Sequence, residues 1–182
     1  MKTLIINGSP NKHGETVSMI EYITKKIKGE YRVINTYYVN VSPCNDCGYC
    51  HTNDSCSIKD DMTELYAYIG ECDNIILASP LYFSQFSGSF LSFMSRIQLF
   101  SVQKYIRGLD TSIMPKKGAV LLNGGGSTID KSGVMQTSRI LMGELNCKSF
   151  KTVCYVGTDK KSVTKDKFTL DEMDKVIDFL NN

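Results

Sequence analysis

The stretch "DNIILAS", residues 73–79, indicates what kind of sheet this chain forms. Successive side chains of a β-strand point to opposite faces, so an unbroken apolar centre needs cover on both faces. Strands of this kind are typical of parallel sheets enclosed by helices. Four more short apolar segments are predicted strands: 3–7, 31–39, 118–124 and 151–157.

Helical patterns alternate with these strands. Apolar residues recur on one face of residues 15–29, and Gly29 is expected to end that helix. Residues 60–71 predict a second helix with Asp60 or Asp61 as its N-cap. Further helices are expected at 88–100, around 138–145 and at 170–180. Because parallel strands need helical crossovers, this alternation predicts one doubly wound α/β domain over residues 1–182.

Composition excludes several classes of protein. The chain has 182 residues, of which 42% are hydrophobic and 22% charged, an ordinary globular balance. A formal net charge of +2 gives no basic field for nucleic acid. No apolar segment is long enough to span a bilayer, and "MKTLIINGSP" (1–10) lacks the apolar core of a signal peptide. We therefore expect a cytoplasmic protein in which the seven cysteines do not form structural disulfides.

Three loops are the candidates for a ligand site, because ligands of doubly wound sheets bind beyond the carboxyl ends of the strands. The first loop, "NGSPNKHGET" (7–16), directly precedes a helix, whose N-terminal N–H groups suit a phosphate. It matches neither the Walker A nor the G-x-G-x-x-G pattern. The alternative is a capped turn in which Ser9 or Thr16 bonds only to the backbone.

The other two loops offer an aromatic surface and a glycine run. "SPLYFSQFSGS" (79–89) leaves the sheet at Pro80 and places Tyr82 and Phe83 where a flat heteroaromatic ring could lie. The alternative is that both aromatic residues cover the core. "NGGGSTIDKSG" (123–133) begins with three glycines that let backbone approach a ligand, although such a run is also typical of a mobile loop.

In this order and spacing, "NGSPNKHGET", "SPLYFSQFSG" and "NGGGS" resemble the flavodoxin-like NAD(P)H-dependent FMN reductases. The resemblance implies a five-stranded sheet of order 2-1-3-4-5. It places the FMN phosphate at Ser9, Asn11, Gly14, Glu15 and Thr16. It places the ring and ribityl chain at Pro80, Leu81, Tyr82, Phe83, Asn123, Gly124 and Gly125. Many relatives have Arg or Lys at the position of Asn11, and Lys12 is expected to supply that charge here. Relatives also tend to have Lys and Asp where this chain has Leu91 and Ser95, which we interpret as surface or interface changes.

Four cysteines gather in the loop 42–58, at Cys44, Cys47, Cys50 and Cys56. They are too compact for the two separated knuckles of a zinc site. The Cys-x-x-Cys-x-x-Cys part matches iron–sulfur ligation, and all four could hold one [4Fe–4S] cluster. The loop resembles that of the iron–sulfur flavoproteins, but cluster-free reductases of the family look similar here, so both interpretations stay open. The other three cysteines, Cys72, Cys147 and Cys154, are expected to be structural.

The resemblance implies an FMN-dependent oxidoreductase that transfers electrons from NAD(P)H to an acceptor such as a quinone, a nitro or azo compound, or an iron–sulfur or other protein. Because the flavin carries the chemistry, no catalytic side chain is assigned. An electron carrier without nicotinamide chemistry and a metal-binding regulatory module are the alternatives. The resemblance also implies a homodimer or homotetramer, and the predicted helix 88–100 is apolar on more than one face, which indicates deep burial or contact with another subunit.

Overall fold

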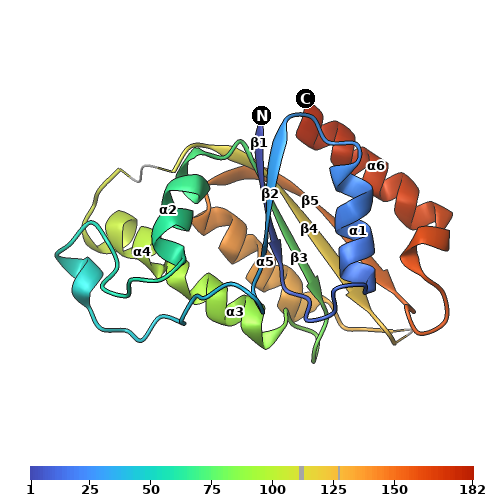
Figure 1. Cartoon of the computed structure of the whole chain (residues 1–182), viewed down its shortest axis with the longest axis horizontal. Coiled ribbons are helices and arrows are strands. Elements are labelled where there is room, and N and C mark those ends of the chain that lie inside the picture. Colours follow the sequence, from blue (N-terminus) through green and yellow to red (C-terminus); the bar gives the residue numbers. More distant parts are fainter. Residues whose placement is uncertain (111–112, 127) are drawn as a thin grey trace.

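The computed structural model describes residues 1–110, 113–126 and 128–182. Five parallel strands form one sheet in the order β2-β1-β3-β4-β5, which confirms the predicted topology (Figure 1). The strands are β1 (Lys2–Asn7), β2 (Glu30–Asn35), β3 (Asn74–Pro80), β4 (Lys116–Gly124) and β5 (Cys147–Val156).

Helices cover both faces of the sheet (Figure 1). One face carries α1 (Glu15–Thr24) and α6 (Lys167–Asn181). The other carries α2 (Met62–Glu71), α3 (Gly88–Met94), α4 (Gln98–Ser101) and α5 (Ser132–Glu144). Within the described ranges, no helix has both the length and the apolar character needed to cross a membrane.

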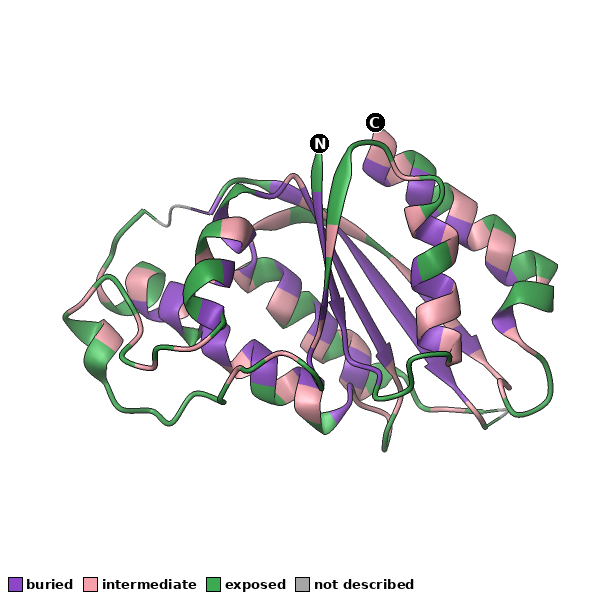
Figure 2. Ribbon diagram, viewed as in Figure 1, coloured by how far each residue is buried: buried purple, intermediate pink, exposed green. Residues whose placement is uncertain are grey.

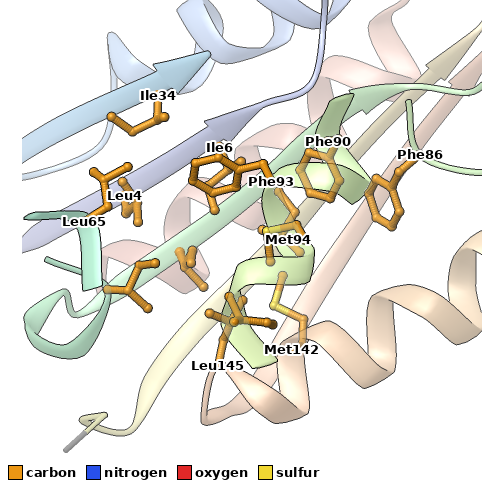
Figure 3. Packing of buried hydrophobic residues seen from close by; sticks show 14 of the residues in the cluster. Leu4, Ile6, Ile34, Leu65, Phe86, Phe90, Phe93, Met94, Met142 and Leu145 are labelled. Carbon is orange, nitrogen blue, oxygen red and sulfur yellow. The ribbon is translucent and has the colours of Figure 1, made fainter. Parts of the chain in front are cut away.

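The central strand β3 contributes to the apolar packing on both sides of the sheet. Ile75 and Leu77 belong to the cluster under α2, α3 and α5, and Ile76 and Ala78 belong to the cluster under α1 and α6. Figure 2 shows the central strands as the buried middle layer, and Figure 3 shows the packing of the first cluster. Burial on both faces is what the unbroken apolar run of this strand predicted.

The predicted helix 88–100 is interrupted in the structure. After α3 the chain forms a 3₁₀ turn at Ser95–Ile97, then α4, then a π-helical segment at Val102–Ile106. Its apolar residues on different faces are buried within the chain: Phe90, Phe93, Met94, Ile97, Leu99 and Phe100. Deep burial, one of the two expected explanations, therefore accounts for its composition.

Several predicted boundaries were wrong; β5, for example, begins at Cys147, four residues before the predicted strand 151–157. The first helix ends at Thr24, five residues before Gly29, which lies in a turn with a left-handed φ of 86°. The predicted strand 31–39 ends at Asn35, because the Asn35 carboxamide oxygen accepts a hydrogen bond from the N–H of Tyr37 at 2.9 Å and turns the chain.

Candidate functional site

A hollow of about 370 Å³ opens at the carboxyl ends of β1, β3 and β4. Eight of the predicted site residues line it: Ser9, Asn11, Gly14, Glu15, Thr16, Pro80, Tyr82 and Asn123. Residues far apart in the sequence thus meet where the three candidate loops leave the sheet. Pro10, His13 and Thr158 also line the hollow but were not assigned to the site from the sequence.

The first loop is held in place by its own side chains. Asn7 accepts from the N–H of Ser9 at 2.9 Å, and the Ser9 hydroxyl accepts from the N–H of Asn11 at 3.2 Å. Asn11 in turn accepts from the N–H of His13 at 2.9 Å. These successive local turns lead the chain to Gly14, the N-cap of α1. The loop therefore presents the N-terminus of α1 in a preformed shape.

Thr16 joins this loop to β4. Its side-chain oxygen accepts a hydrogen bond from the Asn123 carboxamide at 2.7 Å, and both residues are buried. A hydroxyl both donates and accepts, so the Thr16 proton remains available to another acceptor. Thr16 lies in the first turn of α1, where backbone N–H groups lack helical partners. This end of the hollow is therefore a cluster of hydrogen-bond donors.

Glu15 also lines the hollow, but its carboxylate is bound on the other side of the loop. It accepts from the N–H of Val163 at 2.7 Å and from the Ser162 hydroxyl at 3.1 Å. Its negative charge is thus neutralised in part by donors that follow β5. An anion at the N-terminus of α1 would meet the backbone of Glu15, since these two donors hold the carboxylate.

The aromatic loop makes a tight turn beyond β3. Tyr82 and Gln85 exchange backbone hydrogen bonds of 2.9 and 3.0 Å, and both residues between them adopt a left-handed φ, 53° for Phe83 and 60° for Ser84. The Phe83 side chain is fully exposed and Tyr82 is 44% exposed. The interpretation that these two rings cover the core was therefore wrong.

Five predicted site residues lie outside the hollow: Lys12, Leu81, Phe83, Gly124 and Gly125. The Lys12 ammonium lies 4.8 Å from the centre of the Tyr38 ring. A Cβ atom at Gly124 would meet Ile129 at 2.4 Å, and one at Gly125 would meet the Asp159 carboxylate at 2.5 Å. These glycines thus allow close approach by other side chains of the same chain.

The cysteine-rich loop encloses a second cavity, of about 270 Å³, against α4 and the π-helical segment. All four thiols of this loop line it, together with Tyr66, Arg96 and apolar side chains that include Ile58, Leu99, Val102 and Ile106. All seven cysteines of the chain are free thiols. Among the described residues, no three His, Cys, Asp or Glu side chains are drawn together as a metal-binding group.

Two arginines bind the cysteine-rich loop to the helices that it packs against. Arg96 donates to the carbonyl oxygens of Ser42 and Ile58, at 2.9 and 3.3 Å, and pairs with the Asp60 carboxylate at 2.6 Å. Arg107 pairs with Asp54 at 2.7 Å near the tip of the loop. The loop is thereby held at its two ends and at its tip.

Ser95, interpreted from the sequence as a surface or interface residue, also holds this loop. Its hydroxyl accepts from the N–H of Cys44 at 2.9 Å and donates to the carbonyl of Ser92 at 2.6 Å. The side chain of Ser95 thus anchors the start of the cysteine-rich loop to the helix layer, a role that the sequence did not indicate, and its place at a subunit interface stays a prediction.

Arg96 and Asp60 form a buried ion pair beside the cysteine-rich loop. Burial lowers the pKa of the Arg96 guanidinium, but the hydrogen bond with Asp60, with Tyr66 and Cys56 nearby, outweighs it, so this pKa is raised. Burial raises the pKa of Asp60, yet its bonds with Arg96 and the Ser42 N–H hold it below its usual range. Both groups are therefore charged at neutral pH.

The three cysteines outside the loop are in apolar surroundings. Burial raises the pKa of the Cys72 and Cys154 thiols and raises that of Cys147 to about 12. A thiol in such surroundings is protonated at neutral pH and behaves as a small hydrophobic side chain. The structure thus agrees with the structural role predicted for them.

Comparisons with known proteins agree with this architecture. A NAD(P)H:quinone oxidoreductase from Methanothermobacter marburgensis has the same fold, with a TM-score of 0.76 over 100% of this chain and 96% of its own, at 18% identity. An FMN-dependent NADH-azoreductase from Bacillus anthracis, solved in complex with FMN, has a TM-score of 0.67 over 100% of this chain and 99% of its own, at 15% identity.

Sequence relatives are named for their cofactors. An iron–sulfur flavoprotein of Methanosarcina thermophila is 30% identical over 69% of this chain and 64% of its own length. One from Archaeoglobus fulgidus is 28% identical over 59% of this chain and 50% of its own length. The matches to the curated relatives cover between 45% and 64% of the relatives' own lengths. The profile of the NADPH-dependent FMN reductases matches residues 1–160. The chain belongs to the NADPH-dependent FMN reductase family.

Proposed function

We propose that this protein is an FMN-dependent oxidoreductase that takes electrons from NADH or NADPH and passes them to an acceptor. The observation that carries the proposal is the hollow at the carboxyl ends of β1, β3 and β4, where the donors of the first loop lie beside Pro80 and Tyr82. An anion-binding end next to an aromatic end matches a molecule with a phosphate and a flat ring.

The chain's own residues divide the binding of FMN between them. Ser9, Thr16 and the first N–H groups of α1 would hold the phosphate, while Glu15 contributes its backbone, since its carboxylate is bound elsewhere. Asn11 shapes the loop through its bond to His13. Lys12 adds positive charge to this loop, although its side chain lies over the Tyr38 ring and does not line the hollow. These residues bind and orient the cofactor without a proton-transfer role.

The ring end would be formed by the second and third loops. Pro80, Leu81, Tyr82 and Phe83 would border it on one side, and Asn123, Gly124 and Gly125 on the other; of these, Pro80, Tyr82 and Asn123 line the hollow. FMN, when bound, supplies hydride acceptance from nicotinamide and onward electron transfer. The exposed Phe83 and Tyr82 leave an aromatic surface where a second subunit of a homodimer or homotetramer would cover the ring.

The proposal is tested by steady-state oxidation of NADH and NADPH by FMN-loaded protein with quinone, azo and nitro compounds as separate acceptors. Turnover with at least one acceptor, lost when FMN is removed and restored on its addition, is expected. Tight FMN binding without nicotinamide oxidation by any acceptor would favour the electron carrier instead. The net charge of +2 supports the enzyme, because electron carriers of this fold are typically strongly acidic.

A second function is favoured by one specific observation: four free thiols line a single cavity with largely apolar walls. We propose that Cys44, Cys47, Cys50 and Cys56 hold a [4Fe–4S] cluster there. The donor set matches in number and kind, since such clusters take four thiolates, but the four thiols would have to move closer together, because no three of them form a metal-binding group among the described residues. A bound cluster would supply one-electron transfer between the flavin and the acceptor. The iron–sulfur flavoproteins among the relatives support this assignment.

Iron content tests the cluster. Anaerobic reconstitution with iron and sulfide is expected to give about four irons per chain, and these should be lost in Cys47→Ser. FMN affinity should survive that substitution, because Cys47 lies outside the hollow that we assign to FMN. A reconstituted protein that holds no iron would leave an FMN reductase with a cysteine-rich loop.

A further inference from the structure

Arg96 is a buried cation in the wall of the cysteine cavity. Its side chain is 1% exposed, and it makes three hydrogen bonds, to Asp60 and to the carbonyls of Ser42 and Ile58. All three come from its terminal nitrogens. Its remaining buried nitrogen, Nε, has no hydrogen-bond partner among the residues that the structure describes. An N–H that is buried without a partner loses the hydrogen bonds it would make with water.

The neighbouring groups do not satisfy this N–H. The Tyr66 hydroxyl donates to the backbone carbonyl of Arg96 at 3.0 Å. Asp60 is bonded to a terminal nitrogen of Arg96 and to the N–H groups of Ser42 and Met62. Arg96 lines the cavity and Asp60 does not. The positive member of the buried ion pair is therefore the one that borders the four thiols.

A tetrathiolate iron–sulfur group carries net negative charge, and charge in an apolar cavity needs a partner. Hydrogen bonds to sulfur and nearby charge are what set the reduction potential of such a cluster. An arginine with one uncommitted N–H provides both. The guanidinium keeps its charge at any pH the fold tolerates, so this contribution is permanent.

We propose that Arg96 is the cationic partner of the group bound by the four thiols, that its free Nε–H donates toward sulfur, and that it raises the reduction potential of that group. This inference rests on the proposed cluster. The four thiols are the ligands of this group, and Arg96 acts on it only through its nearby positive charge and its hydrogen bond. Asp60 is predicted to have the opposite effect, because its carboxylate offsets the charge of Arg96.

The experiment uses the 182-residue chain with FMN, reconstituted anaerobically with iron and sulfide. The variants are Arg96→Gln, Arg96→Lys, Asp60→Asn and, as the matched control, Arg107→Gln, which removes the other arginine that anchors the loop. Iron, sulfide and FMN are quantified in each. The midpoint potential of the cluster is then measured by redox titration followed by electron paramagnetic resonance, which separates it from the flavin.

Arg96→Gln is expected to make reduction at least tenfold less favourable, a fall of about 59 mV for one electron. Asp60→Asn should raise the potential, Arg96→Lys should recover part of the loss, and Arg107→Gln should leave it unchanged. A purely structural clamp predicts instead that Arg96→Gln and Asp60→Asn change the cluster in the same direction. Shifts of the same sign, or no shift in either variant, would overturn the inference while leaving the cluster in place.

Two further outcomes are decided by other readouts. If Arg96→Gln does not fold, the variants Arg96→Lys and Asp60→Asn test the inference in its place. An unchanged midpoint potential of the cluster in Asp60→Asn would then overturn the proposed effect of Arg96. If the unaltered protein binds FMN but no iron, the cluster and this inference both fall, and the FMN site stands.

Discussion

Replacing Thr16 by valine removes one hydroxyl from the hollow and keeps the shape of the side chain. Two losses follow from the geometry. The bound phosphate loses a donor, and the Asn123 carboxamide, now bonded to Thr16 at 2.7 Å, loses its acceptor. The first loss weakens cofactor binding, and the second weakens the fold because Asn123 is buried.

The two losses have separate magnitudes. A hydrogen bond to a charged group contributes roughly 1.5–3 kcal/mol, so the Kd for FMN should rise about ten- to one-hundred-fold. An unsatisfied buried amide costs about 1–3 kcal/mol of unfolding free energy, which lowers the Tm of a chain of this size by several degrees. Thr16→Ser keeps the hydroxyl and should show little of either effect.

The assay is fluorescence titration of flavin-free protein with FMN and, in parallel, with riboflavin, which lacks the phosphate. Thr16→Val should raise the Kd for FMN and leave the higher Kd for riboflavin nearly unchanged. The ratio of the two dissociation constants should therefore fall. An unchanged FMN affinity would remove this loop from the site. An equal loss for both flavins would mean that Thr16 supports the ring end and not the phosphate.

Other features give predictions of their own. Alkylation of native protein should label the cysteines of the loop 44–56 before Cys147, whose burial raises its pKa to about 12, and mass spectrometry of timed digests reads the order. Gly29→Ala should lower the unfolding free energy by more than about 1 kcal/mol, since φ is 86° and a Cβ would lie 2.1 Å from the backbone oxygen of the first residue. Gly143→Ala, in a helix with open space around it, should instead be neutral or stabilising by up to about 1 kcal/mol in the same denaturant titrations. Hydrogen bonds from Thr169 and Lys161 lower the pKa of Asp166 to about 2. The contribution of Asp166 to the stability of the fold is therefore fully present above its unfolded pKa of roughly 3.9 and is lost as the pH falls through 2. Asp166→Ala should therefore lower the Tm at neutral pH by a few degrees, and the difference in Tm from the original chain should shrink as the pH is lowered toward 2 and vanish below it, as followed by circular dichroism.

The sheet and the hollow that we propose for FMN could be predicted because their signals are local. An unbroken apolar run such as 73–79 reports burial on both faces, and parallel strands bring their carboxyl ends to one edge. Loops that follow different strands therefore meet, as Thr16 and Asn123 do across 107 positions of sequence. That particular hydrogen bond could not be predicted, since it depends on side-chain packing.

The missed features are those fixed by tertiary contacts. Arg96 lies in an apolar segment, and its partners at Ser42, Ile58 and Asp60 are 36 to 54 positions away. Nothing in the local pattern around it indicates that it anchors the cysteine loop. The π-helical segment 102–106 lies beyond the end of the predicted helix 88–100 and was missed for the same reason, since it packs against that loop.

The proposed oxidoreductase function is tested most directly by mixing FMN-loaded protein with NADH or NADPH in the absence of oxygen and following the flavin absorbance. We expect rapid bleaching by at least one of the two nicotinamides, and slower bleaching in protein that binds FMN weakly through Thr16→Val. FMN that is bound stoichiometrically and bleached by dithionite, yet left oxidised by both nicotinamides, would contradict the proposed function.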